Sequence, residues 1–79
     1  MKIGVKILPR PEVLDTQGRA VAQTLAEHGK PVEQCRVGKY VEVDVEGDEQ
    51  TALAKVKELA EFVLYNPLIE TYELEVVKE

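Results

Sequence analysis

Apolar and polar residues alternate along three segments of the chain, and this pattern predicts a β-strand in each of them. The first segment covers residues 2–8, the second about residues 33–46 and the third about residues 70–77. One face of each predicted strand is therefore apolar. Its residues are Ile3, Val5 and Ile7 in the first strand, Cys35, Val37, Val41, Val43 and Val45 in the second, and Tyr72, Leu74 and Val76 in the third.

Residues with helical spacing fill both intervals between the strands. Asp15 is a suitable N-cap for the first helix, which Gly29 and Pro31 end. The pair Gly47–Asp48 opens the second helix, and Asn66–Pro67 closes it. The apolar positions are Ala20, Val21, Leu25 and Ala26 in the first helix, and Leu53, Val56, Leu59, Ala60, Val63 and Leu64 in the second.

The order strand-helix-strand-helix-strand predicts an α+β two-layer sandwich, with an antiparallel sheet and two helices on one face. The length of 79 residues predicts a single domain, residues 1–79. The other face of the sheet stays uncovered and carries charges of both signs, which suits solvent or a polar subunit interface. These charges are Lys2, Lys6, Glu42, Asp44, Glu73 and Glu75.

Gly38 interrupts the second alternating segment and marks a bend or a close approach of another backbone. A two-residue turn at Gly38–Lys39 is excluded, because it would place Tyr40 on the face of Val37 and push the following valines outward. Two solutions remain. One is a hairpin with a three-residue turn over residues 38–40, and the other, which we favour, is one long strand bent at Gly38.

The composition excludes several classes of partner and of structural support. The chain has 15 acidic and 10 basic residues, a formal charge of −5, which argues against nucleic acid and anionic membranes as partners. It contains one cysteine and one histidine, so an internal disulfide cannot form and a structural zinc site is not expected. Without either support, a domain of this size is expected to self-associate. A cytoplasmic protein without a membrane segment is the simplest interpretation.

The polar residues do not form a catalytic set. His28 falls near a helix C-terminus, and Cys35 falls on the apolar face of a strand without a neighbouring base. Arg36, Lys39 and Tyr40 could contact an anion or the carboxylates of a partner, or form a solvated charge cluster. From the residues alone, the chain is a small oligomeric two-layer domain with an unusual central segment.

Three sequence segments indicate a family. They read Val-Leu-Asp-Thr-Gln-Gly at 13–18, Arg-Val-Gly-Lys-Tyr at 36–40 and Asn-Pro-Leu-Ile-Glu-Thr-Tyr at 66–72. In this order and spacing they resemble the signatures of the PurS family, the small subunit of phosphoribosylformylglycinamidine (FGAM) synthase. The length and the order of elements fit as well, so the resemblance covers the whole chain.

The resemblance implies a role in purine biosynthesis. PurS associates with a large synthetase subunit and with a glutaminase subunit, and the assembly converts formylglycinamide ribonucleotide (FGAR), ATP and glutamine to FGAM, ADP, phosphate and glutamate. ATP and magnesium belong to the large subunit, and the nucleophilic cysteine belongs to the glutaminase. PurS itself carries no catalytic residue and no cofactor, forms dimers that can pair further, and bridges the other two subunits.

Candidate subunit-contact residues follow from the three segments that carry the resemblance. The central segment contributes Arg36, Gly38, Lys39 and Tyr40. The other two segments contribute Asp15, Gln17, Gly18 and Asn66.

Two other functions compete with this one. A small dimeric ligand-binding regulatory domain of the ACT or ferredoxin-like kind has a similar element order. Such domains usually need a glycine-rich turn after the first strand, whereas residues 9–12 read Pro-Arg-Pro-Glu. A stand-alone enzyme is disfavoured, because the sequence offers neither an acid-base pair nor a metal-ligand set.

Overall fold

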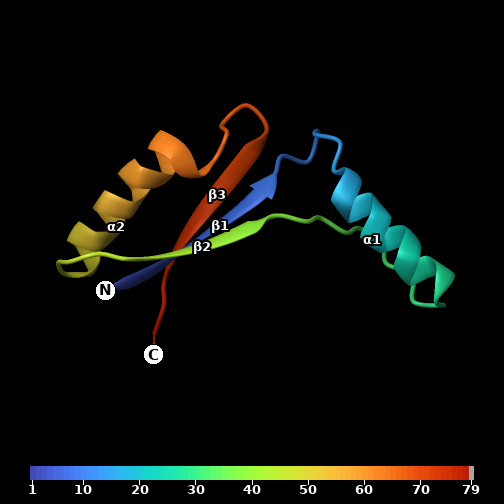
Figure 1. Cartoon of the computed structure of the whole chain (residues 1–79), viewed down its shortest axis with the longest axis horizontal. Coiled ribbons are helices and arrows are strands. Elements are labelled where there is room, and N and C mark those ends of the chain that lie inside the picture. Colours follow the sequence, from blue (N-terminus) through green and yellow to red (C-terminus); the bar gives the residue numbers. More distant parts are fainter. Residues whose placement is uncertain (79) are drawn as a thin grey trace.

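The computed structural model describes residues 1–78 and has the expected order of elements. Three strands, two α-helices and one π-helical turn make up the fold (Figure 1). Their bounds are β1 Lys2–Pro9, α1 Thr16–Glu27, β2 Lys39–Asp44, α2 Glu49–Leu59, the π-helical turn η1 Ala60–Leu64, and β3 Glu70–Val76.

The three strands form an antiparallel sheet in the order β2-β1-β3, as the α+β prediction requires. β1 is the central strand because both of its edges are paired, one with β2 and the other with β3. The register aligns Val5 with Val41 on one side and with Leu74 on the other. Apolar side chains of all three strands therefore share one face, while β2 and β3 are edge strands.

Helix α2 alone provides the core against this apolar face. Six side chains are fully buried, three from β1, two from α2 and one from the first residue of η1: Ile3, Val5, Ile7, Ala52, Val56 and Ala60. Ala52 and Ala60 lie four residues before and after Val56, and their small side chains let the helix lie close to the sheet. α2 packs on β1 and β3.

Helix α1 does not cover the sheet, so the expectation of two helices on one face holds for only one of them. Figure 1 shows α1 beyond the end of the strands, at the opposite end of the molecule from α2. The only buried residue of α1 is Gly18. Its apolar stripe is therefore not used against the sheet of its own chain, and contacts with residues 35–37, described below, hold the helix in its outward position.

The second strand is shorter than the alternation predicts, because its pairing with β1 begins only at Lys39. Residues 34–38 run on from β2 without belonging to a strand. The chain at Gly38 is therefore neither a hairpin nor part of a long bent strand. The physical reason is that polar groups of the loop after β1 bind this segment where a β-ladder would otherwise continue.

The predicted N-cap Asp15 is confirmed, and the second helix begins at Asp48 as predicted. Asp15 and Asp48 accept hydrogen bonds from the backbone amides of Gly18 and Thr51. α1 ends as expected at Gly29, whose φ of +74° belongs to the left-handed region that glycine favours at helix ends. No helix within residues 1–78 is both long enough and apolar enough to span a membrane.

Candidate functional site

The three segments that indicated a family meet at one end of the sheet, which we call the junction. It consists of the loop after β1 with the first turn of α1, residues 10–18, the extended segment with the start of β2, residues 34–40, and the turn with the first residue of β3, residues 66–70. Hydrogen bonds from the first of these segments reach the other two, as described below. The sequence pattern alone did not predict that they lie next to each other.

Asp15 holds two segments of the junction together. Its Oδ1 accepts a hydrogen bond from the Gly18 amide at 2.9 Å, and its Oδ2 accepts one from the Val37 amide at 2.8 Å. These two bonds, first that of Gly18 and then that of Val37, lower the pKa of the Asp15 carboxyl. One side chain thus caps α1 and fixes the helix to the extended segment.

We expect acid to loosen the junction through Asp15. Because its pKa is lower in the folded state than the ordinary value of 3.8, the ionised carboxylate stabilises the fold above that value. This contribution is lost as the pH falls through the lowered pKa. The amide proton of Val37, followed by NMR, should therefore become less protected from exchange at pH values below about 4.

The variant Asp15→Asn provides the control for this prediction. An asparagine still caps the helix, but its side chain no longer titrates and presents only one oxygen to the two amides. Protection of Val37 should be weaker at neutral pH and should not respond to the Asp15 titration. A titration of Val37 that is the same in both proteins would contradict the assignment.

Two glycines allow backbones to approach closely within the junction. A Cβ built on Gly18 would collide with the carbonyl oxygen of Cys35, and one on Gly38 would collide with that of Ile7. Neither glycine has a positive φ. Gly38 is therefore required for space and not for its backbone conformation, and the backbone close to it belongs to β1 of the same chain.

Two arginines bind backbone carbonyls across the junction. Arg36, which is half-buried, donates from Nη2 to the carbonyl oxygen of Pro9. Arg10 donates from Nε and Nη2 to the carbonyl oxygen of Pro67, at 3.0 and 2.8 Å. Both guanidinium groups thus serve as cross-links between loops.

Lys39 and Tyr40 lie on opposite faces of β2, as their parity predicted. Lys39 forms an ion pair with Glu70 at 3.7 Å between Nζ and Oε2. Since Lys39 pairs with Ile7 in the sheet, this ion pair crosses the end of the apolar core. The ring of Tyr40 occupies the space above Gly4 on the open face, where a Cβ would collide with it.

Asn66 shapes the turn that precedes β3. Its Oδ1 accepts from the Leu68 amide at 3.0 Å, and its carbonyl accepts from the amides of Ile69 and Glu70. Its own amide donates to Glu70 Oε1 at 2.8 Å. The helical segment ends at Leu64, just before Asn66, and the Asn66 amide positions the Glu70 side chain that contacts Lys39.

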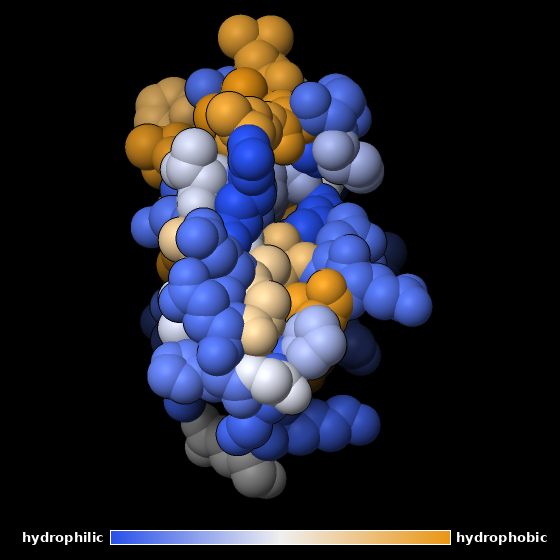
Figure 2. Space-filling view, turned by 90° about the vertical axis from the view of Figure 1, so that its right-hand side faces the viewer, coloured by the Kyte–Doolittle hydropathy of each residue, from blue (hydrophilic) through white to orange (hydrophobic). Residues whose placement is uncertain are grey.

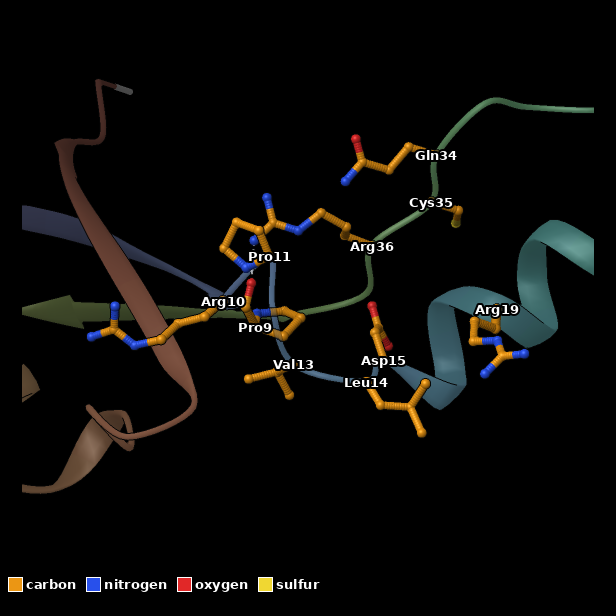
Figure 3. A pocket seen from close by; sticks show the side chains of 10 residues that line it. All are labelled: Pro9, Arg10, Pro11, Val13, Leu14, Asp15, Arg19, Gln34, Cys35 and Arg36. Atoms are coloured by element: carbon orange, nitrogen blue, oxygen red, sulfur yellow. Dashed lines mark hydrogen bonds between the residues drawn. The ribbon is translucent and has the colours of Figure 1, made fainter.

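A hollow of about 210 Å³ opens in the wall of the junction (Figure 3). Its arginines do not converge on a common point, since Arg10 and Arg19 extend in opposite directions. The Asp15 carboxylate also lines the hollow, which makes it unsuitable for an anion. Within the described residues, no group of three histidine, cysteine or carboxylate side chains is placed to hold a metal ion.

The side chains of the remaining residues that the sequence singled out lie outside the hydrogen-bond network of the junction. His28 is the C-cap residue of α1, as its place at a helix end predicted. Cys35 is half-buried and has a free thiol. Gln17 is exposed in the first turn of α1. Whether any candidate touches another chain stays a prediction.

Sequence reasoning missed Arg10, Pro67 and Glu70 as members of the junction. Arg10 stands between Pro9 and Pro11, and this sequence predicts only the end of the first strand. Glu70 was placed at the start of a strand. Neither residue belongs to a periodic pattern. The contacts that they make join residues 31 or more positions apart in the chain, so no local pattern indicates them.

Comparisons with known proteins agree with this arrangement. The sequence model of the family "PurS: Phosphoribosylformylglycinamidine (FGAM) synthase" matches residues 2–78. The PurS subunit of Bacillus subtilis FGAM synthase is 37% identical over 76 residues, which cover 95% of this chain and 90% of the relative.

Solved structures give the same result. The PurS subunit of Thermotoga maritima superposes with a TM-score of 0.88 at 33% identity, covering 94% of this chain and 87% of the other. PurS of Methanocaldococcus jannaschii, one of the subunits of formylglycinamide ribonucleotide amidotransferase, superposes with a TM-score of 0.86 at 29% identity, covering 99% and 96%. The chain therefore belongs to the PurS family of FGAM synthase subunits.

Proposed function

We propose that this chain is a non-catalytic structural subunit that bridges the synthetase and glutaminase subunits of FGAM synthase. In that assembly, ATP-dependent amidation of FGAR uses ammonia released from glutamine. The large subunit holds ATP and magnesium, and this chain binds no cofactor. The complex works in the cytoplasm.

The chemistry of the junction carries this proposal. The polar side chains that a small enzyme would aim at a substrate bind the chain's own backbone here: Asp15 binds two amides, and Arg10 and Arg36 bind two carbonyls. Such a network fixes loop positions and leaves no acid-base pair for catalysis. It is suited to a scaffold whose loops must present a defined surface.

Self-association is part of the proposed function. β2 is an edge strand, and the extended residues 34–38 continue its direction (Figure 1). Unpaired edges readily add a strand from another chain, and a two-fold pairing would repeat the contact symmetrically. We propose a homodimer through this edge and dimers that pair further. The residues at or beside the contact are then Arg36, Gly38, Lys39 and Tyr40.

A second surface is proposed to meet one of the catalytic subunits. Phe62 in η1 and Leu68 in the following turn expose 85% and 83% of their surface. Figure 2 shows apolar side chains gathered at the top of the molecule, the end where Figure 1 places these segments. Large exposed apolar side chains of this kind mark protein interfaces.

We expect the double variant Phe62→Ser/Leu68→Ser to weaken binding to the catalytic subunits by at least about tenfold, since exposed aromatic anchors dominate interface energies. The fold should be preserved, because neither side chain belongs to the core. Isothermal titration of each catalytic subunit with this chain measures the effect. Ala54→Ser, on the exposed side of α2, is the control. Equal affinities for both variants would contradict the assignment of this surface.

Assembly itself tests the bridging role. The synthetase and glutaminase subunits, mixed with and without this chain, are separated by gel filtration with light scattering. We expect one ternary species only when the chain is present. A complex of the two catalytic subunits that has the same stability without it would contradict the proposal.

The ligand-binding regulatory domain has no comparable support. The turn after β1 is closed by the hydrogen bond from the Val13 amide to the Arg10 carbonyl and by the contacts of Arg10 with Pro67. It offers no cradle of free backbone amides.

A further inference from the structure

The turn between η1 and β3 presents Leu68 at its tip. The carbonyl oxygen of Asn66 accepts a hydrogen bond from the Ile69 amide at 3.1 Å. This bond closes a turn that has Pro67 and Leu68 at its centre. Pro67 fixes the first central φ angle, and the Asn66 side chain accepts from the Leu68 amide at 3.0 Å. The backbone is therefore held from within the turn, while Leu68 exposes 83% of its surface.

Arg10 holds the same turn from outside. Its backbone amide donates to the carbonyl oxygen of Ile69 at 2.8 Å. Its guanidinium donates from Nε and Nη2 to the carbonyl oxygen of Pro67, at 3.0 and 2.8 Å. These two carbonyls belong to the residues directly before and after Leu68. Arg10 thus restrains the backbone on both sides of the exposed leucine.

The sequence around Arg10 makes its backbone stiff. Pro9 and Pro11 each have a fixed φ angle and no amide hydrogen, and a residue that precedes proline is restricted to extended conformations. Of these three residues, only Arg10 has an amide that can continue the pairing of β1 with β3 beyond Pro9 and Glu70. Arg10 is half-buried, and Figure 3 shows its side chain extending away from Arg19 and α1. The guanidinium therefore reaches the turn from a fixed starting point.

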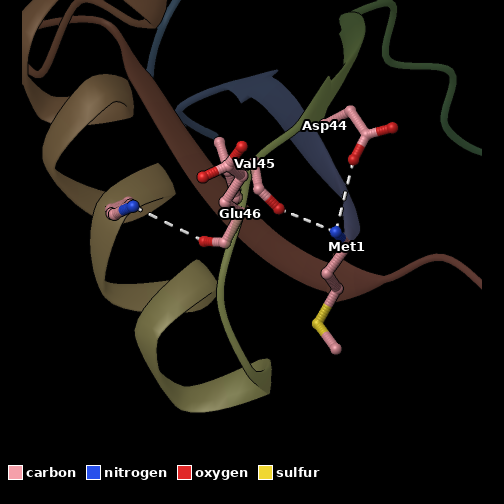
Figure 4. A network of polar contacts seen from close by, with 5 residues as sticks. Met1, Asp44, Val45 and Glu46 are labelled. Atoms are coloured by element: carbon pink, nitrogen blue, oxygen red, sulfur yellow. Dashed lines mark hydrogen bonds and ion pairs between the residues drawn. The ribbon is translucent and has the colours of Figure 1, made fainter.

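A cation at the other end of the sheet makes a weaker contact of the same kind. Lys55 in α2 donates to the carbonyl oxygen of Glu46, just after β2, at 3.5 Å (Figure 4). This bond is single and long, whereas the guanidinium of Arg10 makes a fork of two shorter bonds. Residues 46–48 read Glu-Gly-Asp and offer no apolar side chain. Lys55 thus holds a polar loop, and Arg10 holds an exposed leucine.

A fixed turn favours binding through Leu68. A side chain on a loose turn loses conformational freedom when a partner immobilises it, and this loss weakens an interface roughly two- to tenfold per side chain. A turn that is already fixed avoids the loss. A single protruding apolar side chain on a rigid backbone also fits a concave site on the partner, where it is fully removed from water.

We propose that Arg10 is the positioning residue of the docking surface formed by Phe62 and Leu68. It holds the turn in the shape that a catalytic subunit recognises, and that subunit receives Leu68 in an apolar pocket. The inference rests on the proposed docking of this surface and adds what gives the surface its shape. Arg10 acts through the turn and does not itself touch the partner.

Affinity measurements on the whole chain test the role of Arg10. Each catalytic subunit is titrated calorimetrically with Arg10→Ala and with Lys55→Ala, which also removes one cation that binds a backbone carbonyl. At the subunit that recognises Phe62 and Leu68, we expect Arg10→Ala to weaken binding at least about fivefold. Lys55→Ala should leave the affinity unchanged. Equal affinities for the two variants overturn the proposal.

A double-variant cycle shows whether Arg10 acts through Leu68. In a Leu68→Ser background the pocket contact is already lost, so Arg10→Ala should have little further effect on the affinity. If Arg10→Ala weakens binding by the same factor in both backgrounds, the proposal is wrong. Arg10→Lys keeps the charge but not the planar fork, so it should recover only part of the affinity. Full recovery by lysine would assign the effect to charge alone and contradict the proposal.

Folding is followed in the same samples. Arg10 is not a core residue, so circular dichroism should show that Arg10→Ala is folded. The Glu70 amide, which donates to the Asn66 carbonyl at 2.8 Å, should exchange its proton faster in this variant because the turn opens more often. A Glu70 amide that exchanges equally slowly in both proteins would show that the turn does not depend on Arg10.

The positioning role and the docking surface fail in different ways. If Phe62→Ser/Leu68→Ser leaves the affinity unchanged, the docking surface is wrong and the positioning role falls with it. If this double variant weakens binding but Arg10→Ala does not, only the positioning role is removed and the docking surface stands.

Discussion

Gly38→Val should disrupt the junction and lower the free energy of unfolding by about 1–3 kcal/mol, the range for overpacked sites. The added Cβ would meet the Ile7 carbonyl oxygen and lie 2.8 Å from the Leu8 side chain. The backbone of β1 cannot yield without breaking its pairing, so residues 36–38 must move away instead. That movement would separate Val37 from Asp15 and release α1.

We therefore expect Gly38→Val to lose its normal oligomer and its support of glutamine-dependent turnover together. Urea unfolding gives the stability, and sedimentation gives the oligomeric state. Gly29→Asn is the control, since nothing lies within 4 Å of a Cβ at this site and asparagine tolerates its positive φ. A Gly38→Val protein with the normal oligomer and full glutamine-dependent turnover would show that the central segment is not a subunit contact.

Ile7→Ala should be the most destabilising truncation, with a loss of about 2–5 kcal/mol, because the cavity that it leaves adds to the lost burial. Ile7 is fully buried at the end of β1 where the sheet meets the junction. For a domain whose total stability lies near the lower end of about 5–15 kcal/mol, such a loss leaves a large unfolded fraction. Thermal unfolding followed by circular dichroism measures it.

Leu8→Ala provides the matched control on the next residue of the same strand. Leu8 points to the open face and is 38% exposed, so its truncation should cost about 1 kcal/mol or less. If both variants lost the same stability, the assignment of the core to the α2 face of β1 would be wrong.

Strong periodic signals in the sequence predicted most of the fold. Alternation in residues 2–8 identified β1, and the caps Asp15 and Asp48 identified the starts of both helices. Parity correctly separated the faces of Tyr40 and Lys39. Each of these features depends on residues that are close in sequence, so the sequence pattern is sufficient to predict it.

Features that depend on distant contacts escaped prediction. The alternation of Cys35 and Val37 suggested a strand, but the Val37 amide binds Asp15 instead of a neighbouring strand. Helical spacing placed Leu59 and Val63 with the core residues. The π-helical turn after Leu59 keeps Leu64 against the core and leaves Val63 outside.

The sequence pointed to several residues of the junction but not to their geometry, and their role as subunit contacts stays a prediction. Seven of the eight candidate residues have an identifiable role within the chain, as a cap, a close approach, a ring over a glycine or a cross-link between loops. Gln17, exposed in the first turn of α1, is the exception. The sequence could not show that Arg10 and Glu70 complete the junction, because neither belongs to a pattern. It also could not show that α1 leaves its own sheet, since an amphipathic helix predicts burial without naming the chain that covers it.

The central claim is that this chain enables the catalytic subunits to use glutamine. The synthetase and glutaminase subunits of the same organism are assayed for FGAM formation with glutamine or with ammonium chloride, with and without this chain. We expect glutamine-dependent formation to require the chain, and ammonium to support turnover without it. A glutamine-dependent rate that is unchanged when the chain is left out would contradict the account.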